Sequence, residues 1–230
     1  MTQRILNARP SPPDERDFTL AAAAPVALPS RFTLSGLGPV LDQGGNPSCT
    51  CYSAVGIRHW QEKRDGNGLV PFDPDELYRI VKVLEDRESP FGPYDGAYLR
   101  DVLRILKGSG TPLTTGGRDG KIAGYYRLEL SVGAMKTALA KGPLYVGMNW
   151  DAAWFQCPAT LILRPPVGQI VGGHAVYIWG WDDAVNGGSW IIRNSWGKPW
   201  DRGNGNAYLR YAWFESHGFE AWLSTDVIGD

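Results

Sequence analysis

The chain has 230 residues, which suits one large domain or two lobes that share a core. Its composition is that of a globular protein, with 43% apolar and 20% charged residues, and the formal net charge is −1 without a long run of one sign. This balance argues against nucleic acid or a membrane surface as the main partner. No apolar run approaches the roughly 20 residues that a membrane helix needs.

Three cysteines form a small, odd set, which argues against a disulfide framework and favours a reducing compartment. The stretch FTLAAAAPVALP at 18–29 is similar to the apolar part of an export signal, but acidic residues precede it and Pro25 interrupts it. We therefore expect a cytoplasmic protein, or one exported by a route that leaves no such signal. The sequence does not fix the oligomeric state, and a monomer is the expectation.

Residues 1–27 are predicted to form an extended arm, because they are rich in proline and alanine and lack a hydrophobic period. Residues 28–230 carry the globular pattern. Three prolines stiffen the arm between residues 7 and 18, so it could cover or thread a cleft as a short pro-segment. A disordered tail is the alternative, and the sequence leaves both interpretations open.

The first predicted helix begins at Cys49, directly after Pro47 and Ser48, and stops at Gly66. Ser48 is in the position to cap this helix with its side-chain oxygen. Further helices are predicted at 73–86, where Asp73 precedes Pro74 in the cap position, and at 97–110 and 131–142. Strands, rich in β-branched and aromatic residues and bounded by turn residues, are predicted at 143–150, 172–183, 189–196 and 205–213.

Helices come first and strands follow, which predicts an α+β protein of two lobes that divide near residues 112–125. The helical lobe is expected at about 28–115 and the β-rich, antiparallel lobe at about 116–230.

Cys49 is the candidate nucleophile. At a helix start, unpaired backbone N–H groups and the helix dipole favour an anion, which lowers the pKa of a thiol there. Cys51 lies two residues further on and points to another side of the helix, where a small apolar residue is expected to pack. A thiolate nucleophile also needs an acid–base partner.

His174 is the candidate partner, because it begins an apolar strand directly after two glycines. His174 and Asn194 are equidistant from Ala184, so across a hairpin the Asn194 amide oxygen could accept from one ring nitrogen and leave the other for Cys49. Trp196 could shield this hydrogen bond from water. A plain hairpin with a polar end is the alternative.

Gln43 completes the set. Its side-chain amide could donate to an oxyanion together with the backbone N–H of Cys49. No cluster has the spacing of a metal site, so no metal or cofactor is expected.

These segments together resemble the papain-like cysteine peptidase family over roughly residues 28–225. PVLDQGGNPSCTCYSAVG resembles the segment with the family's oxyanion-hole glutamine and nucleophile, GGHAVYIWGWDD its histidine segment, and IIRNSWGKPWDRGNGNAYLR its asparagine segment. The resemblance implies the two-lobed papain-like fold with the active-site cleft between the lobes. It assigns Cys49, His174, Asn194 and Gln43 as catalytic residues.

The resemblance also implies a substrate-binding surface. GPYDGAYLRDVLRILKGSG is similar to the segment whose glycine binds extended substrate, which points to Gly96 with Asp95 beside it. Gly173 and Ala175 would line the opposite wall of the cleft. Asn46 stands where many family members have a disulfide cysteine, which agrees with a disulfide-free bacterial version.

The implied activity is hydrolysis of peptide bonds in a peptide or protein substrate through a thioester. Two alternatives stay open. The same site could serve a transpeptidase, deamidase or isopeptidase, or the fold could be a non-catalytic peptide-binding module.

Overall fold

The computed structural model describes residues 4–20, 27–88, 96–200 and 204–226. Five α-helices occur in these ranges: α1 (Cys49–Arg64), α2 (Pro74–Glu88), α3 (Leu99–Ser109), α4 (Val132–Leu139) and α5 (Tyr211–His217). Among them, none combines the length and apolarity that a bilayer-crossing helix needs.

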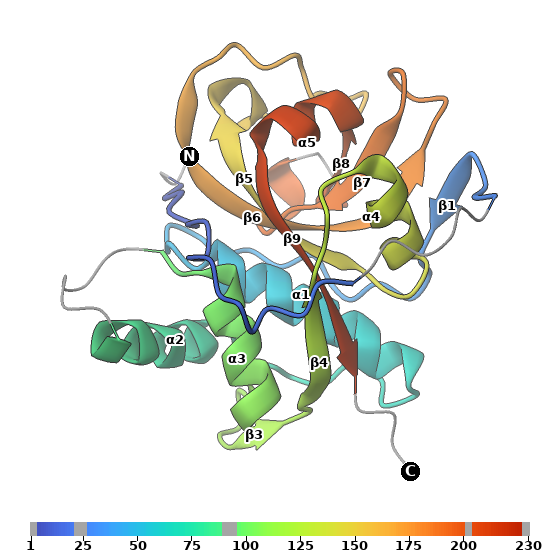
Figure 1. The fold of residues 1–230 in the computed structure, drawn as a ribbon. Helices are drawn as coiled ribbons and strands as arrows, with labels where there is room; N and C mark the ends of the chain where they lie inside the picture. The colour runs from blue at the N-terminus through green and yellow to red at the C-terminus, as the bar shows by residue number, and fades with distance from the viewer. Residues whose placement is uncertain (1–3, 21–26, 89–95, 201–203, 227–230) are drawn as a thin grey trace.

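A seven-stranded antiparallel sheet is formed mostly by the second half of the chain. Its strand order is β4-β9-β5-β6-β7-β8, and β1 pairs with β6. Its strands are β1 (Arg31–Thr33), β4 (Ile122–Arg127), β5 (Leu144–Asp151), β6 (Ile170–Asp182), β7 (Ser189–Arg193), β8 (Asn206–Arg210) and β9 (Gly218–Asp226). A small hairpin joins β2 (Thr111–Pro112) to β3 (Arg118–Asp119). Figure 1 shows α1, α2 and α3 in the lower half of the molecule, beside β4 and the end of β9, and α5 at the top.

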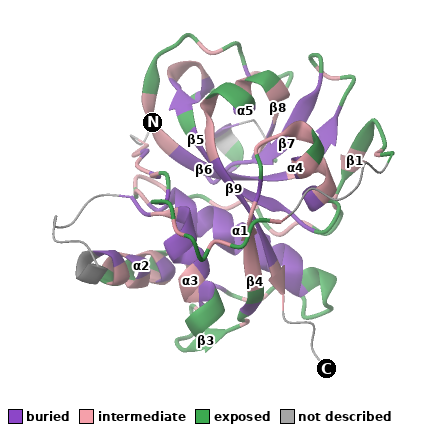
Figure 2. Ribbon diagram, in the orientation of Figure 1, coloured by how far each residue is buried: buried purple, intermediate pink, exposed green. Residues whose placement is uncertain are grey.

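The centre of the sheet is buried on both faces, so each of its strands contributes to two cores. Along β5, Leu144 and Val146 pack into the core on the side of α4 and α5, whereas Tyr145 between them joins the core of α1, α2 and α3. This follows from the two-residue period of a strand, which sends successive side chains to opposite faces. Figure 2 shows the resulting burial of α1 and of the strands above it.

Helix starts behave as the sequence predicts in one case and differently in another. Asp73 caps α2, since its Oδ1 accepts from the backbone N–H groups of Asp75 and Glu76 at 3.0 and 2.9 Å. Ser48 precedes α1 but makes no capping hydrogen bond, and its buried hydroxyl has no partner among the described residues. The predicted cap is therefore wrong in its side-chain contact.

The sequence predicts β5, β6, β7 and β8 but misses the other five described strands, β4 and β9 of the main sheet among them, and it extends β8 too far. β9 lies between β4 and β5, so the last described strand of the chain sits inside the sheet. The residues after Arg210 begin α5 instead of continuing the strand to Trp213. The division into an arm at 1–27 and a domain at 28–230 stays a prediction.

Candidate active site

Cys49 is the first residue of α1 and is fully buried. The start of this helix packs against β6, where the Ser53 hydroxyl donates to the Ala175 carbonyl over 2.9 Å. The backbones of Ala175 and of Ala8 are near enough to act on the Cys49 thiol. Ala175 directly follows His174 on β6, so the residue whose backbone adjoins the Cys49 thiol is the neighbour of the histidine.

His174 lies on β6 with no exposed surface, and its Nε2 is 2.8 Å from the Asn194 Oδ1 atom. That same oxygen accepts from the Ser195 backbone N–H at 2.8 Å, which fixes the orientation of the amide group. Because Asn194 presents an acceptor, the histidine Nε2 must donate, and in the neutral ring Nδ1 is then an unprotonated base. Nδ1 is buried without a partner among the described residues.

The route by which Asn194 reaches His174 differs from the predicted one. β6 and β7 pair Tyr177 with Arg193, and the register shifts between Ile178 and Gly180. In this register the histidine and asparagine are not opposite each other, so their predicted cross-strand pairing is wrong. Asn194 directly follows the end of β7, and its side chain makes the expected hydrogen bond from there.

Two tryptophans enclose the imidazole. The ring centroids of Trp196 and Trp150 lie 4.8 and 4.7 Å from that of His174, and both indoles are buried. Trp196 is the residue expected to shield the histidine hydrogen bond. Trp150 was missed, although its place at the end of a predicted strand beside the histidine strand offered a signal.

Gln43 is buried beside the segment that follows Asn194. Its Oε1 accepts from the Ser195 hydroxyl at 2.7 Å, and its backbone N–H donates to the Ser195 carbonyl at 2.9 Å. The side-chain Nε2 donates to the Asn46 carbonyl at 2.8 Å. An amide nitrogen carries two hydrogens, so one N–H remains available for an oxyanion.

The cleft is filled by the chain's own first residues. The Ala8 N–H donates to the Gly173 carbonyl at 2.9 Å, and the Arg9 N–H donates to the Ala97 carbonyl at 3.4 Å. Figure 1 shows this dark-blue segment crossing in front of α1 and α3. One backbone strand of the arm therefore contacts both walls of the cleft.

Gly96 and Gly173, two of the expected substrate contacts, lie on the path of the arm. A Cβ atom would stand 1.8 Å from the Asn7 carbonyl oxygen if placed on Gly96, and 1.8 Å from that of Ala8 if placed on Gly173. Both glycines therefore permit a close backbone approach. Asp95 lies outside the described residues, and the sequence reading missed Ala97, the neighbour of Gly96.

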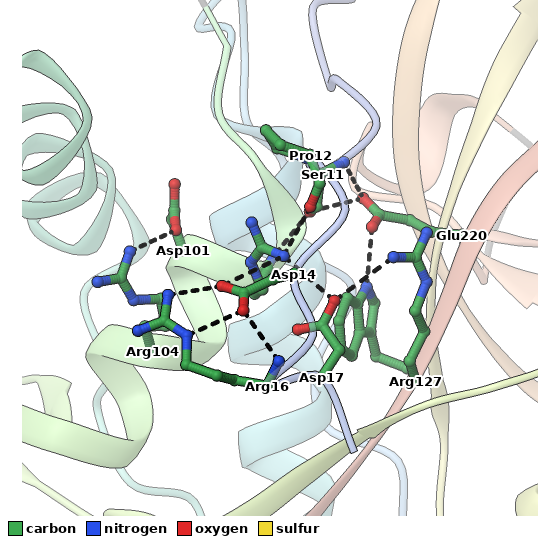
Figure 3. Close-up of polar contacts among 11 residues, drawn as sticks. Ser11, Pro12, Asp14, Arg16, Asp17, Asp101, Arg104, Arg127 and Glu220 are labelled. Atoms are coloured by element: carbon green, nitrogen blue, oxygen red, sulfur yellow. Dashed lines mark hydrogen bonds and ion pairs between the residues drawn. The ribbon is translucent and has the colours of Figure 1, made fainter. Parts of the chain in front are cut away.

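Polar contacts hold the next part of the arm, as Figure 3 shows. The Ser11 N–H and hydroxyl donate to Glu220 Oε1 at 3.3 and 3.2 Å. Further along, Asp17 Oδ2 pairs with Arg100 Nη1 at 3.1 Å and with Arg127 Nη1 at 3.4 Å. The arm is thus attached to α3 and to the sheet as well as to the cleft.

In the covered cleft, burial favours the neutral thiol of Cys49 and the neutral imidazole of His174, whereas a catalytic pair needs a thiolate and an imidazolium. Burial raises the pKa of the Cys49 thiol to about 11, and hydrogen bonds from nearby backbone groups offset this only in part. Burial also lowers the pKa of His174 to about 4; its hydrogen bond to Asn194 opposes this shift, and the positive charge of Arg4 adds to it. The expected low thiol pKa is therefore wrong for the covered state, because desolvation outweighs the helix start.

The chain is similar to known cysteine proteases in sequence and in structure. The model of the papain family cysteine proteases matches residues 109–220. Caricain from Carica papaya is 28% identical over 172 residues, which cover 70% of this chain and 49% of caricain. Cathepsin K from Gallus gallus is 27% identical over 178 residues, which cover 70% and 52%. The chain spans about half the length of the curated relatives it matches.

Solved structures show the same fold. Xylellain, a cysteine protease from Xylella fastidiosa, superposes with a TM-score of 0.81 at 22% identity, over 99% of each chain. The cysteine protease and lectin-like domains of Cwp84 from Clostridium difficile give 0.72 at 16% identity, over 98% of this chain and 56% of that one. The predicted two-lobed α+β fold is confirmed.

Proposed function

We propose that the chain is a papain-like cysteine peptidase that hydrolyses peptide bonds through a thioester on Cys49, since the papain family model matches residues 109–220. One observation carries this proposal, the hydrogen bond between His174 Nε2 and Asn194 Oδ1, which leaves Nδ1 as the base. The residue after His174 is Ala175, whose backbone adjoins the Cys49 thiol. A base held in one tautomer beside a nucleophile at a helix start is the arrangement that activates a thiol.

The proposed reaction begins when His174 Nδ1 takes the thiol proton and the Cys49 sulfur attacks the substrate carbonyl carbon. The remaining N–H of the Gln43 amide and the backbone N–H of Cys49 stabilise the oxyanion, each worth on the order of 3 kcal/mol. The imidazolium then gives its proton to the departing amine as the C–N bond breaks. In the second half, His174 takes a proton from water, hydroxide attacks the thioester, and the C–S bond breaks to return the thiol.

We propose further that the form with the arm in the cleft is latent. The arm excludes substrate from the contacts at Gly96 and Gly173, and it buries the thiol and imidazole so that both are neutral near pH 7. Both effects end when the arm leaves, because water then reaches the sulfur and the charge of Arg4 leaves with the arm.

Alkylation with limiting iodoacetamide near pH 6 tests the proposed pair. We expect Cys49 to react well before Cys51 and Cys157 once the arm has been cut from the folded chain, and His174→Ala to remove the difference. Mass spectrometry of products made with and without an added amine separates hydrolysis from transpeptidation. A non-catalytic binding module is the conclusion if no tested peptide is cleaved and Cys49 shows no selective reactivity.

A further inference from the structure

The side chain of Arg9, in the arm, contacts a carboxylate and an aromatic ring on the helical wall of the cleft. Its Nη2 is 3.0 Å from Glu85 Oε2, and its guanidinium carbon lies 4.3 Å from the centre of the Tyr98 ring. A guanidinium over an aromatic face, with a carboxylate beside it, receives both a cation–π and an ion-pair attraction.

Glu85 also has contacts that do not involve the arm. Its side chain is only 4% exposed, its Oε1 accepts from the Tyr98 N–H at 2.8 Å, and its Oε2 accepts from Lys82 Nζ at 3.0 Å. Lys82 in turn donates to the Gly96 carbonyl at 3.0 Å. The carboxylate therefore has contacts from α2 and from the segment that begins α3 in addition to its contact with Arg9.

Burial raises the pKa of Glu85 above its ordinary value. Withdrawing a carboxyl group from water disfavours its charged form, and a nearby cation offsets that cost. A peptide that brings a cation to this point is therefore favoured over a neutral one.

The site at Glu85 lies next to a main-chain contact that an extended peptide can make. Arg9 donates its backbone N–H to Ala97, the residue before Tyr98, so main-chain contact and side-chain site lie next to each other. Main-chain hydrogen bonds give affinity to any extended peptide, whereas a pocket beside them selects its side chain. An extended segment that repeats the contact of Arg9 with Ala97 in the same direction presents its side chain near Glu85.

We propose that Glu85 and the face of Tyr98 form a subsite for a basic side chain, so that Arg9 of the arm occupies a substrate-specificity site and the preferred substrates carry arginine there. Arginine is favoured over lysine, because its planar group stacks on the tyrosine while donating to the carboxylate. This selectivity for substrate rests on the proposed peptidase function, but binding of a basic side chain does not.

Binding is tested on the folded full chain carrying Cys49→Ala and a sequence-specific cleavage site inserted within residues 21–26. After cutting and removal of the arm fragment, a fluorescent peptide RILNARPSP, which copies residues 4–12, is titrated. In this peptide the second arginine corresponds to Arg9 of the chain. We expect its replacement by alanine or by neutral citrulline to weaken binding about tenfold, and its replacement by lysine to weaken binding less.

Glu85→Gln should abolish most of the difference between the arginine and citrulline peptides, and Glu76→Gln serves as the control on the same helix, since Glu76 pairs with Arg79. Equal binding of the arginine, citrulline and alanine peptides to the chain with Glu85 intact overturns the subsite. So does a Glu85→Gln variant that weakens all peptides equally. The peptide comparison stands even if that variant fails to fold.

Turnover of peptide libraries by the same cut chain with Cys49 intact separates the two claims. Cleavage with no preference for arginine or lysine at any position refutes the subsite and leaves the peptidase proposal standing. Selective binding of the arginine peptide without cleavage of any peptide supports the subsite and refutes the peptidase proposal.

Discussion

The Ala8 N–H donates to the Gly173 carbonyl over 2.9 Å, which places the backbone of the arm one residue away from His174. A Cβ on Gly173 would collide with the Ala8 carbonyl oxygen, so the contact depends on the glycine. Of the two roles that the sequence left open for the arm, threading of the cleft is the one found in the structure. Whether the arm inhibits is a prediction that follows from this contact.

Cutting the chain within residues 21–26 and removing the arm fragment should raise both turnover and the alkylation rate of Cys49. The reason is that the fragment covers the thiol and occupies the backbone contacts at Gly96 and Gly173. We expect at least a tenfold increase in alkylation near pH 7, on the order of the change from a largely protonated to a largely ionised thiol. Alkylation of Cys157, whose Sγ lies near the Pro158 and Asn206 carbonyl oxygens, is the internal reference. Unchanged turnover after cutting would dismiss inhibition by the arm.

The pH dependence of alkylation should differ between the intact and the cut chain. Only the thiolate reacts, and in the intact chain the pKa of Cys49 is about 11. Its rate should therefore stay low at neutral pH and rise as the pH passes through about 11. In the cut chain the rise should come several pH units lower, because the desolvation that raises the pKa is removed. Overlapping profiles in a stopped-flow alkylation assay would contradict this account.

The part of the site that the sequence predicts is the part set by local chemistry. Cys49 begins a helix directly after Pro47 and Ser48, as predicted, although the Ser48 side chain does not cap it, and Asp73 caps the next helix through contacts two and three residues away. The His174–Asn194 hydrogen bond was also expected, since both residues flank one hairpin. Each of these predictions depends on residues that are close together along the chain or that flank a single hairpin.

What the sequence does not predict depends on contacts distant along the chain. A register shift near Gly180 alters which residues of β6 and β7 are opposite, although the hydrogen bond survives. β9 was missed because its place between β4 and β5 follows from the assembled sheet and not from its own pattern. The raised pKa of Cys49 arises from burial of the thiol in the assembled core, which outweighs the local effect of the helix start.

Asp17→Asn should loosen the arm, because it weakens two ion pairs, to Arg100 and Arg127, that attach the arm to α3 and β4. Hydrogen bonds to charged groups contribute about 1.5–3 kcal/mol, so we expect roughly a tenfold faster alkylation of Cys49 in the intact chain. Asp183→Asn is the matched control, since its partners Lys136 and Tyr211 do not belong to the arm. An equal effect of the two substitutions would argue against a role of Asp17 in docking.

Asn194→Ala should lower kcat of the cut chain with little change in KM. The imidazole loses the acceptor that fixes its tautomer, but the nitrogen itself remains, so the loss should be smaller than the roughly 10²–10⁴-fold expected for His174→Ala. Steady-state kinetics on one peptide substrate measures both variants. A thermal midpoint close to that of the parent shows that the fold is intact, and an unchanged kcat would remove Asn194 from the mechanism.

Arg58→Ala should destabilise the whole protein by about 3–5 kcal/mol, because it removes one partner from a buried ion network. Arg58 on α1 is only 1% exposed and pairs with Glu62 on its own helix and with Asp226 at the end of β9, where the Nη1–Oδ2 distance is 2.6 Å. Without the guanidinium both carboxylates stay buried with less compensation, and a link between the helices and the sheet is lost.

Urea denaturation followed by tryptophan fluorescence measures this loss, and Arg79→Ala provides the comparison on α2. Arg79 is 72% exposed and pairs with Glu76 at 2.5 Å, and an ion pair open to solvent contributes about 0–1 kcal/mol. The expected result is a large fall in the urea midpoint for Arg58→Ala and almost none for Arg79→Ala. Equal midpoints would mean that water replaces the guanidinium at Asp226 without cost, and the network would then have no structural role.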